Sequence, residues 1–463
     1  MPLGAATPRP ETDRPPPGWA WTAALAVPWL LWWAALYPGV IAHDTVQQWL
    51  QVLSGRWDDW HPPLQAWLMA LAVAPLGTFG VLSAAQVVVA AMLAGRLLDV
   101  ARRRDAPPRL LLLAVAWMVV SPVYAVGAAT VVKDTTFALG LVTVVVLLLP
   151  VAWGGRLSAA RGAVVGVVLA ALWLLRLNGP VVVVPTLAAL AWRVGRPGRR
   201  AVAIALGTLV AVGGLVRGPV YAALDVSHGA DINTQYQLVQ RLAAHVHAGT
   251  PMSDDERAVL ERLMPLAEWD AGYDCVSGEG LFYEHGLPLG MLPDAAPALR
   301  ALWLRLAWRA PGVEWAHWRC VTRYVWWPTT GVDVGIGADG VTVDRNDVGL
   351  VSAPLDARLG TLARLVLVQT LNGRWLRVLI WSPALPLWLV VAAVLVAWRR
   401  APDVRGPLLL WTPAFANTAC WLLLSGYPGL RYQWSVVLLA PALACLALAD
   451  WAGGGDASAP RAV

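Results

Sequence analysis

A polar ribbon, HDTVQQWLQVLSGRWDDWHPPLQ at residues 43–65, follows the first long apolar run of the chain and holds three aspartates, two histidines and four glutamines. Asp44 lies just after the apolar run, and Asp58, Asp59 and His61 close the same loop. Carboxylates and imidazoles are the side chains that most often move protons in catalysis. Asp44 is the best candidate for a base, because a helix end supports it better than a turn would.

A second set of ionisable side chains is scattered along the chain, each at the end of an apolar run: Lys133, Asp134, Arg176, Arg217, Arg431 and the neighbouring Tyr432. Charged groups at a bilayer are costly and often functional. Guanidinium groups hold phosphate with paired hydrogen bonds, and an ammonium holds it as a point charge. Each residue alone also has a structural explanation, as a local ion pair or a contact with lipid phosphate. Together they favour a substrate with a lipid tail, a phosphate and a polar head.

Metal binding is predicted less clearly than phosphate binding. His43-Asp44 with His61, and separately His245-x-His247, lack the regular spacing of a zinc site, so no dedicated zinc site is expected. A Mg²⁺ or Mn²⁺ ion held by carboxylates and a substrate phosphate remains an open alternative. The chain has no Walker loop, no Rossmann glycines and no nucleophile elbow, which argues against a nucleotide-sugar or ATP-driven reaction.

The composition places these residues in a membrane protein. Of 463 residues, 58% are hydrophobic and 14% are charged, against about 25% charged in soluble domains. The net charge of +6 does not indicate nucleic acid, because the arginines lie in short segments between apolar runs, as topology signals do. The sequence therefore predicts an all-α polytopic fold.

Roughly 20 apolar residues are needed to cross a bilayer. We predict ten crossings: a pair of short helices within 162–192, broken at Arg176–Pro180, and spans at 19–41, 79–98, 110–132, 135–153, 201–221, 376–398, 406–427 and 433–449. The apolar run 64–74 is too short to span, so we expect an interfacial or re-entrant helix there.

The arginines give the orientation. Loops 96–109, 154–161, 193–200 and 399–405 carry fourteen arginines against three acidic residues, which places them in the cytoplasm. The predicted parts are therefore a disordered cytoplasmic tail (1–18), a membrane core (19–221) with a first outer loop (42–78), an extracytoplasmic segment (222–375), C-terminal membrane helices (376–449) and a cytoplasmic tail (450–463).

The outer segment has its own signals. Ser253 and Glu256 have the spacing of a capping box, which predicts a helix to about Trp269. Alternating tryptophans and arginines at 301–327 are typical of helices at the level of the lipid head groups. Cys275 and Cys320 can pair if this segment is outside the cytoplasm.

Several of these motifs together resemble the GT-C superfamily of membrane glycosyltransferases, in particular its protein O-mannosyltransferase and aminoarabinose-transferase branch. Asp44 through His61-Pro62-Pro63-Leu64, with the short helix that follows, is similar to the first outer loop of that branch. The other similarities are Lys133-Asp134, the segment LLRLNGPVVVVP (174–185) and Arg431-Tyr432 with Pro441. The resemblance covers mainly residues 19–200. The chain departs from it in having Asp44-Thr45 where Asp-Glu is usual, and in lacking a large soluble C-terminal domain.

The resemblance implies an inverting enzyme of the cell membrane that moves a sugar from a polyprenyl-phosphate donor to a glycan, lipid or protein acceptor on the outer face. Asp44 would be the base. The substrate-binding residues would be Asp59, His61, Lys133, Asp134, Arg176, Arg431 and Tyr432. A transporter or flippase of a lipid-linked sugar is the alternative, less favoured because the charges lie at one edge of the membrane instead of its midplane. A non-catalytic membrane partner is the third hypothesis.

Overall fold

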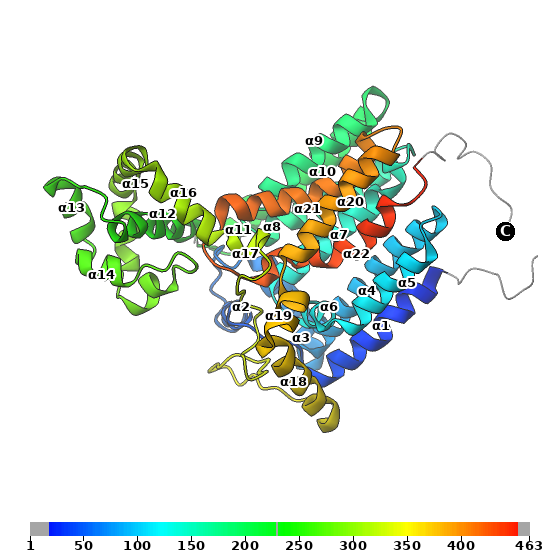
Figure 1. Ribbon diagram of the computed structural model, residues 1–463, viewed down its shortest axis with the longest axis horizontal. Helices are drawn as coiled ribbons and strands as arrows, with labels where there is room; N and C mark the ends of the chain where they lie inside the picture. The colour runs from blue at the N-terminus through cyan, green and yellow to red at the C-terminus, as the bar shows by residue number, and fades with distance from the viewer. Residues whose placement is uncertain (1–17, 228–229, 452–463) are drawn as a thin grey trace, which may run out of the picture.

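The computed structural model describes residues 18–227 and 230–451, except for the side chains of 230–234, so the predicted tails 1–18 and 450–463 fall almost wholly outside the described residues. The described chain is helical, with isolated β-bridges and no strand. Its helices form a large bundle and a smaller lobe to one side (Figure 1). The predicted all-α class is confirmed.

The bundle and its connections contain the following helices: α1 (Gly18–Ala35), α2 (His43–Ser54), α3 (Pro63–Leu76), α4 (Gly80–Arg103), α5 (Pro108–Val120), α6 (Pro122–Ala129), α7 (Lys133–Ala152), α8 (Ala159–Leu175), α9 (Pro180–Val194), η2 (Arg196–Gly198), α10 (Arg199–Leu215), η3 (Val216–Val220), α11 (Tyr221–Ala223), α17 (Arg323–Trp326), α18 (Ala357–Asn372), α19 (Arg374–Trp381), α20 (Ala384–Arg400), α21 (Arg405–Leu424), η6 (Leu430–Gln433) and α22 (Trp434–Ala447). The lobe contains α12 (Ala230–His247), α13 (Asp254–Glu261), α14 (Leu266–Ala271), η4 (Gly280–Glu284), η5 (Leu289–Met291), α15 (Leu292–Arg309) and α16 (Pro311–Val321).

By length and apolar composition, five helices among the described residues are able to cross a membrane: Gly80–Arg103, Lys133–Ala152, Arg196–Ala223, Arg405–Leu424 and Leu430–Ala447. Two bent helix pairs, α5–α6 and α19–α20, raise this to seven if each is one span. Three shorter apolar helices, α3, α8 and α9, do not reach spanning length. The chain is thus a multi-pass membrane protein, while the ten-crossing topology and the interfacial position of α3 stay predictions.

Proline explains where predicted spans bend. The predicted span 110–132 is two helices meeting at 59° across Ser121-Pro122, and 376–398 is two helices meeting at 46° across Ser382-Pro383. Proline lacks the N–H that would continue the helix and clashes with the preceding turn. The break predicted at Arg176–Pro180 is also present, between α8 and α9.

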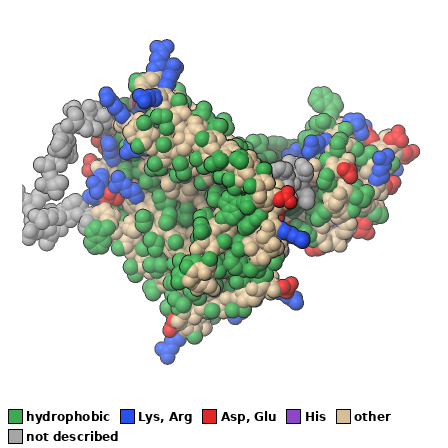
Figure 2. Space-filling model, turned by 180° about the vertical axis from the view of Figure 1, so that it is seen from behind, with side chains coloured by type: hydrophobic (Ala, Val, Ile, Leu, Met, Phe, Trp, Pro, Cys, Tyr) green, Lys and Arg blue, Asp and Glu red, His purple; other side chains and the backbone are tan. Residues whose placement is uncertain are grey.

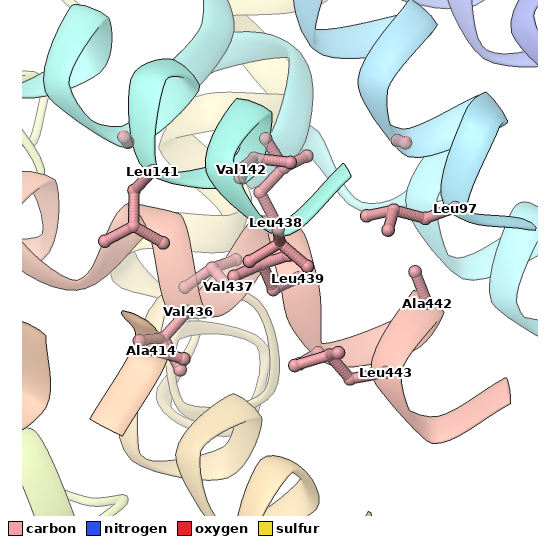
Figure 3. Close-up of a cluster of buried hydrophobic side chains, with 14 of the residues drawn as sticks. Leu97, Leu141, Val142, Ala414, Val436, Val437, Leu438, Leu439, Ala442 and Leu443 are labelled. Atoms are coloured by element: carbon pink, nitrogen blue, oxygen red, sulfur yellow. The ribbon is translucent and has the colours of Figure 1, made fainter. Parts of the chain in front are cut away.

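The buried centre of the bundle is α22. Its apolar side chains pack against Leu97 of α4, Leu141 and Val142 of α7 and Ala414 of α21 (Figure 3). Hydrophobic side chains cover the face of the bundle seen in Figure 2, whereas acidic and basic ones gather on the lobe and at the end of the bundle near the chain termini. This distribution fits a bundle with lipid around its middle.

The lobe has its own apolar core, made mainly by α12 and α15. Ser253 and Glu256 form the predicted capping box, but α13 ends at Glu261 and a second helix, α14, begins after Pro265. Cys275 and Cys320 form a disulfide with their Cα atoms 5.8 Å apart.

Candidate functional site

A parallel bridge between Val40 and Thr130 brings two distant parts of the chain together. The backbone N–H of Val40 donates to Ala129, and that of Val131 donates to Val40. Gly39 makes this approach possible: its φ is +126°, and a Cβ there would lie 2.7 Å from the carbonyl oxygen of Ala129. Three residues beyond the bridge on each segment, α2 begins at His43 and α7 begins at Lys133.

Asp44 and Lys133 occupy these two helix starts. Lys133 Nζ donates to Asp44 Oδ2 at 2.7 Å, and the two side chains are only 11% and 15% exposed. On the other side, Arg431 Nη2 lies 3.5 Å from Asp44 Oδ1. The carboxylate that the sequence marked as the candidate base is therefore held between two cations from α7 and η6.

His61 completes this part of the site. Its Nδ1 lies 3.0 Å from Lys133 Nζ and 4.0 Å from Asp44 Oδ2. The loop is fixed from behind, because the backbone N–H of His61 donates to Asp58 Oδ1 and the Gln51 amide donates to Asp58 Oδ2, both at 3.1 Å. Asp58 and Gln51 therefore orient the imidazole toward the ammonium group.

Asp134 and Arg176 form a second, deeper ion pair. The Asp134 side chain is fully buried and accepts from Arg176 Nη1, while its other oxygen lies 3.5 Å from Arg431 Nε. Arg176 Nε donates to Asn178 at 3.1 Å, and its guanidinium lies 4.6 Å from the ring centre of Trp421. These contacts hold Arg176 and Asp134 in place next to Arg431.

Arg431 connects the two pairs, and its contacts are long. Besides the two carboxylates at 3.5 Å, its Nη2 donates to the Tyr432 hydroxyl at 3.4 Å. The Tyr432 ring stacks on Trp421 at 3.8 Å, which fixes the backbone next to Arg431. Three cations thus surround two carboxylates, so these five side chains carry one positive charge in excess.

The charges around Asp44 and His61 set their protonation. Burial alone would raise the pKa of Asp44, but the positive charges of Arg431 and Lys133 outweigh it and hold that pKa well below its usual value. Burial, followed by the charge of Lys133, lowers the pKa of His61 to about 3. At neutral pH Asp44 is therefore an anion and His61 is neutral, so His61 accepts the hydrogen bond from Lys133.

The pKa of His61 makes a prediction about stability. The folded His61 stays neutral down to about pH 3, whereas the unfolded side chain gains a proton below about pH 6.5. The unfolded chain then binds more protons, so folding stability falls as the pH falls through this window. At pH 5 the contribution is about 2 kcal/mol. We expect the apparent unfolding temperature in detergent to fall less between pH 7 and pH 5 for His61→Gln than for the native protein.

An identical fall in unfolding temperature for the His61→Gln and native proteins would show that His61 binds protons equally in the folded and unfolded states.

Two predicted residues lie outside this cluster. Asp59 faces Arg217 instead, with Asp59 Oδ2 3.9 Å from Arg217 Nη1. His43 is exposed and lies 3.4 Å from the amide of Gln47. Among the described residues, no group of three or more histidine, cysteine, aspartate or glutamate side chains is placed to hold a metal ion. The two histidines of the His245-x-His247 motif have different partners. His245 contacts Glu314 at 3.2 Å, whereas His247 contacts Asp270.

Sequence reasoning missed an acidic edge of the site. Asp333 bonds through its backbone to Pro428 and Leu430, beside Arg431, and the backbone of Asp344 bonds to Ile41, close to Asp44. Burial raises the pKa of Glu279 and of Asp344, and the charge of Asp333 raises both further. The signal in the sequence was weak, since Asp333 and Asp344 lie in the glycine-rich stretch GVDVGIGADGVTVDRN far from any span.

Comparison with known proteins finds no matching family model, no matching curated protein and no matching solved structure.

Proposed function

We propose that this chain is an inverting glycosyltransferase that moves a sugar from a polyprenyl-phosphate donor to an acceptor hydroxyl at the predicted outer face of the cell membrane. The observation that carries the proposal is the five-residue cluster in which Lys133, Arg176 and Arg431 exceed the two carboxylates by one charge. A buried excess of positive charge at the ends of apolar helices suits a phosphate whose lipid tail lies in the bilayer.

The proposed reaction is a single displacement. The acceptor oxygen forms a bond with the anomeric carbon while the bond from that carbon to the phosphate oxygen breaks, and its electron pair leaves with the polyprenyl phosphate. The acceptor proton passes to Asp44. Lys133 and Arg431 stabilise the charge that develops on the leaving phosphate, which is where preorganised cations lower a barrier most.

Binding of the donor would also change Asp44. Lys133 and Arg431 both neutralise this carboxylate while no phosphate competes for them. A donor phosphate that draws these two cations toward itself weakens their hold, so the pKa of Asp44 rises and the carboxylate becomes a stronger base. The cations would thus couple arrival of the donor to activation of Asp44.

Transport of a lipid-linked sugar is the second candidate, and one observation favours it. Bent or broken apolar helices occur at α5–α6, α8–α9 and α19–α20, and transporters often place substrate sites at such breaks. The ionisable cluster nevertheless lies at helix ends, where α2 and α7 begin and α8 ends. This position suits chemistry at a membrane edge better than passage through the midplane.

Purified protein in liposomes distinguishes the two functions. Polyprenyl-phosphate sugars extracted with label from the host membrane should be consumed, with release of polyprenyl phosphate and appearance of the label in a new glycosidic linkage. The linkage should have the anomeric configuration opposite to that of the donor. Movement of labelled donor between leaflets without release of polyprenyl phosphate would contradict the transferase and support the transporter.

A further inference from the structure

Arg217 and Tyr221 form a second polar site that the proposed reaction does not use. Arg217 lies in the π-helical turn η3, and such turns often occur at functional sites. Arg217 Nε and Nη2 and the Tyr221 hydroxyl are buried and make no hydrogen bond to any part of the chain that the structure describes. Tyr221 is only 3% exposed. Buried donors are nearly always paired in proteins. These three groups lack a hydrogen-bond acceptor among the described residues, although Asp59 lies within ion-pair distance of Arg217.

Asp59 is an ion-pair partner of Arg217 but accepts no hydrogen bond from Nε or Nη2. Its Oδ2 lies 3.9 Å from Arg217 Nη1, which is beyond hydrogen-bond distance. Asp59 is held in place by the loop, because its backbone N–H donates to Ser227 at 3.0 Å and Ser227 donates to Trp57. Two of the three guanidinium nitrogens, Nε and Nη2, make no hydrogen bond to this carboxylate.

Aromatic rings enclose the guanidinium group. Its carbon lies 5.6 Å from the ring centre of Trp173 and 5.9 Å from that of Tyr221. Trp67 packs edge-on against Tyr221 at 6.4 Å, and Trp57 against Trp67 at 6.2 Å. The Trp173 ring sits over Gly213, one turn before Arg217, where a Cβ would lie 2.5 Å from it. The chain therefore keeps Arg217 beside Trp173 and Tyr221, with Trp67 and Trp57 packed behind Tyr221. Tryptophan and tyrosine are common at the level of lipid head groups.

The site lies on a helix at the periphery of the bundle. The helix that carries it, Arg196–Ala223, is peripheral, with only 22% of its most apolar window buried. Arg217 lies six residues before the end of that helix, about 9 Å along its axis, at the end opposite to the arginine-rich turn 193–200. Leu215 and Gly218 beside it are exposed.

We propose that Arg217, Tyr221 and the surrounding tryptophans bind the phosphate of an anionic lipid that enters from the predicted outer leaflet. The guanidinium nitrogens Nε and Nη2 form the fork that a phosphate accepts with two hydrogen bonds, and the Tyr221 hydroxyl supplies a third. Asp59 is next to Asp58, which orients His61, so this lipid phosphate is connected to the Asp44 cluster through a single short loop. If the proposed transfer holds, the bound lipid is positioned as its acceptor.

Lipid binding by the purified full-length protein tests this without any turnover. Short-chain phosphatidic acid is titrated by native mass spectrometry, with short-chain phosphatidylcholine and inorganic phosphate as alternative ligands. We expect Arg217→Met to weaken phosphatidic acid binding at least tenfold, Arg217→Lys to weaken it less and Tyr221→Phe to weaken it about fivefold, the value of one hydrogen bond. Arg200→Met, which removes an exposed arginine from the other end of the same helix, should bind like the native protein.

Each other result has a definite meaning. Equal binding of phosphatidylcholine and phosphatidic acid, or no change in Arg217→Met and Tyr221→Phe, would refute the site. Equally strong binding of inorganic phosphate would refute the requirement for a lipid. Asp44→Asn should leave lipid binding unchanged, so a failure of the proposed transferase and a failure of this site are separate results.

Discussion

Replacement of Asp44 by asparagine should lower sugar transfer by a factor of about 100 to 10,000, the usual contribution of a general base. The substitution keeps the shape of the side chain and removes the charge that accepts the acceptor proton. It also releases Lys133 and Arg431 from their shared carboxylate. Donor KM should therefore stay constant or fall while kcat falls, and steady-state kinetics on the labelled donor would separate the two effects.

The Asp44→Asn variant needs a check on folding, because removing one member of a buried ion pair costs about 3–5 kcal/mol in other proteins. The apparent unfolding temperature and retention of the Arg217 lipid site supply that check. Asp255→Asn, an exposed carboxylate in the first turn of α13, is the matched control and should transfer sugar at the native rate. In a strain without the native copy, full restoration of envelope glycans by Asp44→Asn would show that Asp44 is not the base.

The sequence predicted the members of the cluster better than it predicted the membrane topology. Asp44, Lys133, Asp134, Arg176 and Arg431 were chosen because each lies at the end of an apolar run. The structure joins all five in one chain of ion pairs, in the order Lys133, Asp44, Arg431, Asp134 and Arg176. Ionisable groups in an apolar chain have few ways to be satisfied, so their types and positions constrain where they meet.

The helix breaks were partly hidden from sequence. The apolar runs 110–132 and 376–398 are long enough to cross a bilayer, and only the structure shows that each bends, at Ser121-Pro122 and at Ser382-Pro383. A proline inside an apolar run either bends a span or divides it, and packing against neighbouring helices decides which. Periodicity and length carry no information on that packing.

The partner of Asp59 could not be predicted either. The sequence placed Asp59 with His61, two residues away, but Asp58 orients His61 and Asp59 points to Arg217. Successive side chains in a short loop point in different directions, and the backbone bonds between Trp57, Asp59 and Ser227 fix which one faces inward. These bonds join parts of the chain about 170 residues apart.

Replacement of Arg431 by methionine should have the second large effect, with donor KM raised and kcat lowered by a combined factor of about 100 to 1,000, as for removal of one preorganised donor to a developing anion. The contacts of Arg431 with both carboxylates are 3.5 Å long, so its guanidinium is not committed to either of them. Arg431→Lys keeps the charge without the fork and should recover part of the loss.

The exposed Arg374 at the start of α19 is the matched control for Arg431, and Arg374→Met should keep native kinetics.

The decisive measurement is the dependence of kcat/KM on pH. Arg431 helps to hold the pKa of Asp44 well below its usual value, so its loss raises that pKa and Asp44 becomes protonated at a higher pH. The residual activity of Arg431→Met should therefore fall on the acid side at a higher pH than that of the native enzyme. A loss of rate with no movement of the acid limb would show that Arg431 binds donor without acting on Asp44. A donor KM within twofold of native would show that the phosphate is held elsewhere.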